Sequence, residues 1–349
     1  MTRPTLRTLS VIDYHTEGEP MRVIVDGVPP IPGRTLMERS EHLAAHGRDL
    51  LGFSLYEPRG HAAMCGAILT DPVTAGADVG VLFIEPLGPV HMCGHGAIAL
   101  GAMLVETGRV AAPDGTATVT LETPAGLVSC RVATGAGRPT SVTIRNVPAF
   151  SVGLDLAVDV PGLGRLAFDL AYGGHFYALV EAAACGLTLE AKEAARIVEV
   201  GERIRLAIEA RVPLVHPAMP EARGLLYVQF YERPRRPDAH LRNAVVVAPA
   251  GLDRSPCGTG TSARLANLHA RGRLGVGETF GHESIIGTLF TGRIAALTHV
   301  AGTPAVVPEI TGRAWMTARA TLSLDASDPF PGGFLLSEGA STAPSEPPP

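Results

Sequence analysis

Lysine is nearly absent from this sequence. Lys192 is the only lysine among 29 basic residues, and the rest are arginine. A pyridoxal enzyme needs a lysine for its Schiff base, and a P-loop needs a lysine beside the phosphates. Lys192 lies in the charged stretch 190–193, which is typical of an exposed helix. We therefore expect neither chemistry, and any amino-acid chemistry must run without pyridoxal phosphate.

Long apolar runs and an excess of positive charge are also missing. No apolar run approaches the roughly 20 residues that span a bilayer, and residues 1–12 lack the basic and apolar segments of a signal peptide. The 29 basic and 34 acidic residues give a net charge of −5, without long runs of one sign. Nucleic-acid binders normally carry a basic face. We expect neither a membrane nor a nucleic-acid partner.

Cysteine is sparse, with five residues and no CxxC pair. This number and spacing exclude a disulfide framework and predict a reducing, cytoplasmic location in which free thiols persist. We expect Cys130 and Cys185 to be small core residues, because free cysteine is commonly buried.

Glycine and proline, by contrast, are abundant, at 40 and 29 of 349 residues. This length favours two domains at roughly 150 residues each. A helix is predicted at about 189–210 with Thr188 as its N-cap, and the Ser/Pro-rich end, 341–349, is predicted to be disordered. Short apolar or alternating runs between turn residues predict strands at 22–25, 79–84, 117–121, 142–144, 226–230 and 244–248.

An internal repeat is the most informative feature of the sequence. Residues 93–96 read Cys-Gly-His-Gly, and residues 257–260 read Cys-Gly-Thr-Gly. Each copy follows a predicted strand and a Pro-x-Gly turn, continues with Ala and Leu at helical spacing, and stops at a glycine suited to a helix C-cap, Gly108 or Gly272. One such turn would most often be structural only. Two matched copies predict two similar halves, each with a cysteine at a helix N-terminus.

Cysteines at two helix starts suggest a specific chemistry. The free N–H groups and partial positive charge of a helix start are expected to lower a cysteine pKa from about 8.5 towards neutrality. Glycines beside them let a carboxylate approach both helix starts. One thiolate could then take a proton from the carbon next to that carboxylate, while the opposed thiol protonates the other face. The helix amides would stabilise the developing charge, and no metal or organic cofactor is required.

The two repeats resemble the active-site signatures of the proline racemase family, at 92–96 and 253–262. The resemblance implies an α/β (α+β), diaminopimelate-epimerase-like fold, in which two pseudo-symmetric domains each wrap a sheet around a central helix and the site lies in the cleft between them. It extends over about 11–334 and includes further motifs at 57–61, 172–176, 277–280 and 283–286.

We expect the two halves to divide near residue 165. The N-terminal half, 1–165, carries Cys93 and is expected to be rejoined by a C-terminal strand at about 326–340. The C-terminal half, 166–325, carries Cys257.

The resemblance also implies roles for individual residues. Cys93 and Cys257 would be the proton-transferring pair. His95 and Asp253 would contact the ring nitrogen of the substrate. The carboxylate would be held by the backbone amides of four residues, Gly94, His95, Gly258 and Thr259. Gly96 and Gly260 are further expected substrate-binding residues.

The residue at the second catalytic position and the residues that line the pocket indicate which substrate the protein takes. Dehydratases of the family usually carry Thr at the second position, and Cys257 therefore favours inversion. Proline-specific members tend to place bulky aromatics where this chain has Cys65 and Val247. The extra room slightly favours 4-hydroxyproline over proline as the substrate. A trans-3-hydroxyproline dehydratase is the alternative, and a homodimer is one candidate assembly.

Other interpretations of these residues stay open. His91, Cys93 and His95 alternate, as three zinc ligands on a strand would, although the second repeat has no histidines and the glycines disfavour a regular strand. A metallohydrolase or a non-catalytic amino-acid-binding protein is thus a third class. Asp253 could serve only as a turn cap, and we expect His15 and Glu19 to give structural support first.

Overall fold

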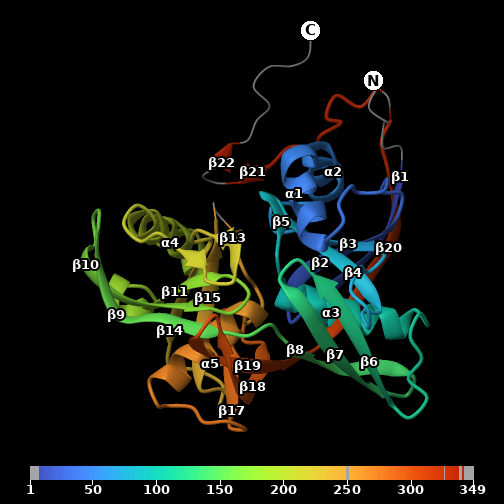
Figure 1. Ribbon diagram of the computed structural model, residues 1–349. Helices are drawn as coiled ribbons and strands as arrows, with labels where there is room; N and C mark the ends of the chain where they lie inside the picture. Colours follow the sequence, from blue (N-terminus) through green and yellow to red (C-terminus); the bar gives the residue numbers. More distant parts are fainter. Residues whose placement is uncertain (1–7, 249–250, 326, 338–339, 342–349) are drawn as a thin grey trace.

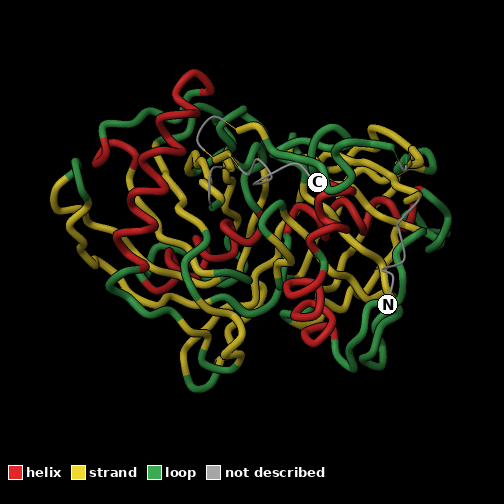
Figure 2. The backbone as a smooth tube through the Cα atoms, turned by 90° about the horizontal axis from the view of Figure 1, so that it is seen from above, coloured by secondary structure: helices red, strands yellow, loops and turns green. Residues whose placement is uncertain are grey.

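The computed structural model describes residues 8–248, 251–325, 327–337 and 340–341. It shows a mixed α/β fold with two lobes side by side, seen in Figure 1 and, from above, in Figure 2. Within the described residues, one sheet of eighteen hydrogen-bonded strands runs through both lobes. No helix in this part of the chain is long and apolar enough to cross a membrane.

The N-terminal lobe wraps strands around one helix, α3 (Gly94–Glu106), and carries α1 (Leu36–His46) and α2 (Arg48–Leu55) outside β3 and β4. The last long strand of the chain, β20, returns to pair antiparallel with β1. The strands of this lobe are β1 (Thr8–Thr16), β2 (Glu19–Asp26), β3 (Cys65–Thr70), β4 (Val79–Glu85), β5 (Gly88–Val90), β6 (Thr116–Thr123), β7 (Gly126–Gly135), β8 (Arg138–Arg145) and β20 (Ala314–Ser323).

The C-terminal lobe repeats this plan around α5 (Gly258–Ala270), with α4 (Ala194–Glu209) against β9, β14 and β15. Its long strands are β9 (Phe150–Val160), β10 (Gly164–Tyr172), β11 (Phe176–Glu181), β14 (Tyr227–Glu232), β15 (Leu241–Val247), β17 (Thr279–Glu283), β18 (Leu289–Val300) and β19 (Thr303–Gly312). Shorter elements of this lobe are β16 (Gly251–Leu252), the pair β12 (Val215–His216) with β13 (Met219–Arg223), and 3-10 turns Ala182–Cys185 and Ala191–Glu193. The pair β21 (Leu336–Ser337) with β22 (Ala340–Ser341) lies beside the N-terminal lobe, where the Leu336 N–H donates to Glu57.

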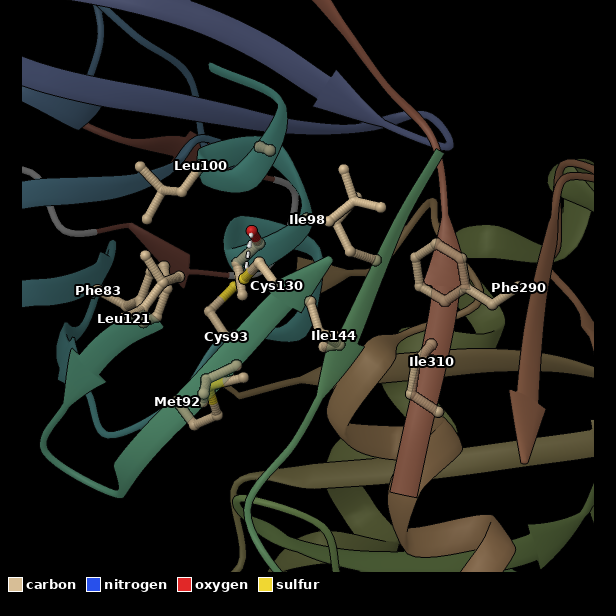
Figure 3. Close-up of a cluster of buried hydrophobic side chains, with 14 of the residues drawn as sticks. Phe83, Met92, Cys93, Ile98, Leu100, Leu121, Cys130, Ile144, Phe290 and Ile310 are labelled. Carbon is tan, nitrogen blue, oxygen red and sulfur yellow. Dashed lines mark hydrogen bonds between the residues drawn. The ribbon is translucent and has the colours of Figure 1, made fainter. Parts of the chain in front are cut away.

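The two central helices are buried on all sides for most of their length. Every residue of α3 from Gly94 to Leu104, and every residue of α5 from Gly258 to Leu268, is buried. A helix that is apolar all round, as α3 nearly is, must be enclosed. The polar side chains that α5 buries are hydrogen-bonded instead, as Asn267 is to Asp169. In Figure 3, Ile98 and Leu100 of α3 lie in a core to which Phe290 and Ile310 of the C-terminal lobe also belong. The helix starts are therefore fixed by a core shared between the lobes.

Most local predictions agree with the structure. Each of the six predicted strands falls within or overlaps an observed one. Gly108 and Gly272 follow their helices in the left-handed region, at φ of +73° and +67°, as predicted. Cys130 and Cys185 are buried, at 0% and 6% exposed.

The long helix begins later than predicted. It starts at Ala194, not near 189, and Glu193 rather than Thr188 is its N-cap. The reason is tertiary: the Leu189 N–H donates to Glu232 at 3.0 Å, and Glu190 is extended. Of the predicted disordered tail, Ser341 belongs to β22 and the remainder lies outside the described residues. The division near residue 165 and the rejoining strand at about 326–340 stay predictions. The lobes described above instead change between β8 and β9, and the strand that returns to the N-terminal lobe is β20.

Candidate active site

The N-termini of α3 and α5 meet end to end, and glycine makes this possible. A Cβ on Gly94 would lie 2.7 Å from the Gly258 Cα, and a Cβ on Gly258 would lie 2.8 Å from the Gly94 Cα. No real side chain fits at such a distance, so only glycine allows this approach of two backbones. The free N–H groups of both helix starts are thereby concentrated at one place.

Both repeat cysteines open into one cavity at this junction. Its volume is about 560 Å³, counting the space open to solvent. Each cysteine directly precedes its helix as the N-cap. The predicted site residues that line the cavity are Cys65, Cys93, Gly94, His95, Val247, Asp253, Cys257, Gly258 and Thr259.

Gly96 and Gly260 do not line the cavity but lie behind the thiols. A Cβ on Gly96 would lie 3.1 Å from the Cys93 Sγ. The Gly260 N–H donates to the Cys257 Sγ at 3.4 Å. These two glycines position the sulfur atoms, and the prediction that they bind substrate directly stays untested.

Cys93 is almost fully enclosed. It is 6% exposed, and its Sγ lies 3.3 Å from the Nδ1 of His95. Burial raises the pKa of Cys93 well above its ordinary value, and the negative charge of Glu85 raises it further, against a hydrogen bond from the Gly96 N–H.

Cys257 is held from the opposite lobe. Its backbone φ of +64° is in the left-handed region, an unfavourable conformation for cysteine that the surrounding structure must enforce. The hydroxyl of Tyr177 lies 3.3 Å from its Sγ and 2.6 Å from the Thr259 Oγ1. Burial, followed by the charge of Asp253, raises the pKa of Cys257 well above its ordinary value despite these partners.

The pKa shifts contradict the expectation that the helix starts lower both thiol pKa values. Each sulfur receives at least one backbone hydrogen bond that lowers its pKa. Burial has the larger effect, because a thiolate loses its hydration in an enclosed site. A sequence motif reveals the helix start but not the degree of enclosure. Without a substrate in the cavity, burial therefore favours the neutral form of both thiols.

Some polar groups around the thiols are held by hydrogen bonds within the protein, and some also face the cavity, where a ligand can contact them. Asp253 caps its turn by accepting the Ser255 N–H at 2.7 Å, and it also lines the cavity. Burial lowers the pKa of His95, which favours the neutral ring. Glu19 accepts the Arg254 N–H at 2.6 Å. Burial and the nearby Asp253 raise the Glu19 pKa well above its usual range. Glu19 is thus both structural support, as expected, and part of the cavity wall.

Sequence reasoning missed several residues that line the cavity, among them the polar residues Glu85, Tyr177 and Tyr227. The Tyr227 hydroxyl donates to both carboxyl oxygens of Glu85, at 3.2 and 3.3 Å. Burial raises the pKa of Glu85 to about 7, against this hydrogen bond. A carboxylate that ends an apolar strand before a Pro-x-Gly turn was a usable signal for Glu85. The tyrosines gave no local signal, because they reach the site from β11 and β14.

The alternating histidines do not form a metal cluster. The structure shows no group of three or more metal-ligating side chains among the residues it describes. Cys93 and His95 belong to the start of α3 rather than to a strand. His91 instead lines a separate cavity, where its ring stacks on that of His175 at 6.3 Å between centroids.

Comparisons with known proteins identify relatives of this chain. The family model described as proline racemase matches residues 11–335. A 4-hydroxyproline 2-epimerase of Streptosporangium roseum is 50% identical, covering 95% of this chain and 99% of that protein. A proline racemase of Clostridioides difficile is 40% identical, covering 95% and 98%.

Solved structures extend the comparison to the fold. A hydroxyproline epimerase from Agrobacterium vitis, solved with bound trans-4-hydroxy-L-proline, superposes with a TM-score of 0.91 at 40% identity, covering 95% of this chain and 96% of that one. A PhzF-family protein of Bacillus anthracis shares the fold alone, with a TM-score of 0.56 at 14% identity. The fold is the diaminopimelate-epimerase-like fold expected from the sequence.

Proposed function

The chain belongs to the proline racemase family, and on that premise we propose that it is a 4-hydroxyproline 2-epimerase acting through Cys93 and Cys257. It is an amino-acid racemase or epimerase, and its substrate is a small molecule. The observation that carries the proposal is that both thiols open into one cavity at the junction of two helix starts.

The helix starts suit the substrate carboxylate. Their N–H groups carry partial positive charge and need acceptors. A carboxylate held there places the adjacent α-carbon between the two cysteines. As the α-proton leaves, negative charge moves onto the carboxylate, where donors are already aimed.

Asp253 suits the substrate ammonium group. It lines the same cavity, and its negative charge is one cause of the raised pKa of Cys257. An ammonium group bound beside Asp253 offsets that charge and makes thiolate formation easier. The neutral His95 ring, 3.3 Å from the Cys93 sulfur, can accept or donate a hydrogen bond to the nitrogen or the thiol.

The two thiols then exchange roles with the direction of reaction. One cysteine, as thiolate, takes the α-proton and becomes a thiol. The other, as thiol, gives its proton to the opposite face of the α-carbon and becomes a thiolate. Proton and charge balance within the site, and inversion follows because the two bases face opposite sides of one carbon.

The small side chains in the cavity wall and the names of the most similar listed relatives favour 4-hydroxyproline over proline as the substrate. Cys65 and Val247 line the cavity in place of large aromatics, which leaves space for a ring substituent. Relatives named 4-hydroxyproline 2-epimerase reach 50% identity, whereas a proline racemase reaches 40%. Proline racemase activity is the second candidate, because that relative covers the chain equally well.

A substrate panel tests the proposal. The purified protein, without added cofactor, is incubated with L- and D-proline, the 4-hydroxyproline epimers and trans-3-hydroxy-L-proline, and products are separated by chiral chromatography. We expect inversion at the α-carbon of 4-hydroxyproline, faster than that of proline. Loss of water from 3-hydroxyproline without any inversion would instead identify a dehydratase.

Three further predictions from the sequence remain proposals. All five cysteines are free in the structure, in keeping with the reducing, cytoplasmic location proposed above. A homodimer and the absence of a nucleic-acid partner rest on the sequence alone.

A further inference from the structure

The Glu85–Tyr227 pair lines the cavity but has no part in the reaction described above. Glu85 ends β4 in the N-terminal lobe, and Tyr227 begins β14 in the C-terminal lobe. The Tyr227 hydroxyl donates its single proton to the Glu85 carboxyl, and its oxygen lies 3.2 and 3.3 Å from the two carboxyl oxygens. When Glu85 is ionised, its two carboxyl oxygens and the Tyr227 oxygen have no further proton to donate. The pair can therefore only accept hydrogen bonds from a ligand.

Several other polar groups that line the cavity already have a partner in the protein or a role in the general reaction. The Tyr177 hydroxyl bonds Thr259 and Cys257. Glu19 accepts the Arg254 N–H. Asp253 and the helix amides suit the ammonium and carboxylate groups that every amino acid carries. Among the described carboxylates that line the cavity, Glu85 is the one that neither accepts a backbone N–H nor is assigned to the ammonium group, so it is the candidate partner for a group that distinguishes one substrate from another.

The pair is also held rigidly. The Tyr227 ring stacks on Tyr177 at 5.0 Å between centroids with a 16° interplanar angle, and it packs against His175 at 5.2 Å. Tyr227 itself is only 4% exposed. A hydrogen-bonding group that is already held in place loses less conformational entropy on binding than a mobile one, and therefore gives more selectivity. Ala62 and Ala63, which line the same cavity, add no bulk.

We propose that Glu85, oriented by Tyr227, accepts a hydrogen bond from the ring hydroxyl of the substrate and so selects hydroxyproline over proline. The proposal rests on the function proposed above and assigns its ring specificity. Proline offers no donor to these acceptors, whereas a hydroxylated ring does. A hydrogen bond to a charged group is worth more than one between neutral groups, so the pair favours the hydroxylated ring over the unsubstituted one.

The test is the ratio of kcat/KM for trans-4-hydroxy-L-proline to that for L-proline. It is measured in the wild-type protein and in Glu85→Gln, Glu85→Leu and Tyr227→Phe. We expect Glu85→Leu to lower the ratio on the order of 10- to 100-fold, as loss of a hydrogen bond to a charged group does. Glu85→Gln keeps an acceptor and should lower it less. Tyr227→Phe keeps the carboxylate but not its orientation, and should also lower it.

Controls separate this proposal from the general function. Glu199→Gln, on the exposed face of α4 with a side chain 69% exposed, should leave both rates unchanged. Thermal unfolding and residual turnover of L-proline show that each variant is folded. The assignment to Glu85 is wrong if the wild-type protein inverts 4-hydroxyproline but the Glu85 variants keep the wild-type ratio of kcat/KM values. An equal loss of kcat/KM for both substrates leaves that ratio unchanged and would have the same meaning. If the wild-type protein inverts neither substrate, the proposed function itself fails.

Discussion

At the scale of single residues, the two cysteines are equivalent in position but not in conformation. Cys93 precedes α3 with an extended φ of −139°, whereas Cys257 precedes α5 with a left-handed φ of +64°. Their surroundings differ too, since His95 contacts one sulfur and Tyr177 the other. Burial is nevertheless the largest influence on both pKa values.

Alkylation of the free protein should reveal the raised thiol pKa values. Only the thiolate reacts with iodoacetamide, so labelling of Cys93 and Cys257 should be slow at pH 7 and rise about tenfold per pH unit past pH 8.5, the ordinary cysteine pKa. Mass spectrometry of the labelled peptides measures each site separately. A labelling rate that is already constant between pH 7 and pH 8 would mean that the helix starts outweigh burial.

Much of the residue-level site was predictable from the sequence, for a physical reason. Cys93, Gly94 and His95 are consecutive, so a local motif contains their geometry once the helix start is recognised. Glu85 and Tyr227 come from strands of opposite lobes, and their meeting depends on how the two lobes pack. The direction of the thiol pKa shifts depends on the same packing.

At the scale of elements, the site depends on the contact between α3 and α5. Both helices are 13 residues long and begin at the glycine after a cysteine. Each is followed, directly after its C-cap, by a left-handed glycine. This symmetry was predictable because the repeat specifies the start and the stop of each helix. The start of α4 was not, because a contact with Glu232 of β14 keeps residue 189 outside the helix.

Adding one methyl group at the junction should disable the site. In Gly94→Ala, the new Cβ would lie 2.7 Å from the Gly258 Cα, and the helix starts must separate. A displacement of about 1 Å near reacting groups can cost about 100-fold in rate. We expect a loss in kcat/KM of that order, measured by chiral product analysis.

The matched control is Gly332→Ala, where nothing lies within 4 Å of the added Cβ. It should leave the rate and the thermal midpoint unchanged. Wild-type activity in Gly94→Ala would show that the two helix starts need not approach so closely.

At the scale of the whole molecule, β8 and β19 join the lobes. They pair antiparallel, with Arg145 opposite Glu309. One Glu309 oxygen accepts from Arg145 at 2.9 Å, and the other accepts from Arg293 of β18 at 2.7 Å. Burial of Glu309 opposes its charge, but these arginines prevail and hold its pKa below the ordinary value.

Replacing this carboxylate should destabilise the fold in a pH-dependent way. A lowered folded-state pKa adds stability above the unfolded-state value, near pH 4.3, and that stability disappears as the pH falls through the folded-state pKa. Glu309→Gln should lower the free energy of unfolding by about 1–2 kcal/mol at pH 7 and by much less at pH 3.

Urea unfolding at both pH values measures the difference, with Glu199→Gln as the exposed-pair control. An equal loss at pH 7 and pH 3 would show that the charge of Glu309 is not responsible.

The most direct test of a mechanism with two opposed bases is to find whether the hydrogen on the product α-carbon comes from the solvent or from the substrate. The protein is mixed with 4-hydroxyproline in D₂O, and both epimers are examined by mass spectrometry after a small fraction has reacted. Since the donating thiol has exchanged with solvent, the product should carry deuterium at the α-carbon while the unreacted substrate keeps protium. Protium retained in the product, or deuterium appearing early in the substrate, would mean that one base serves both faces.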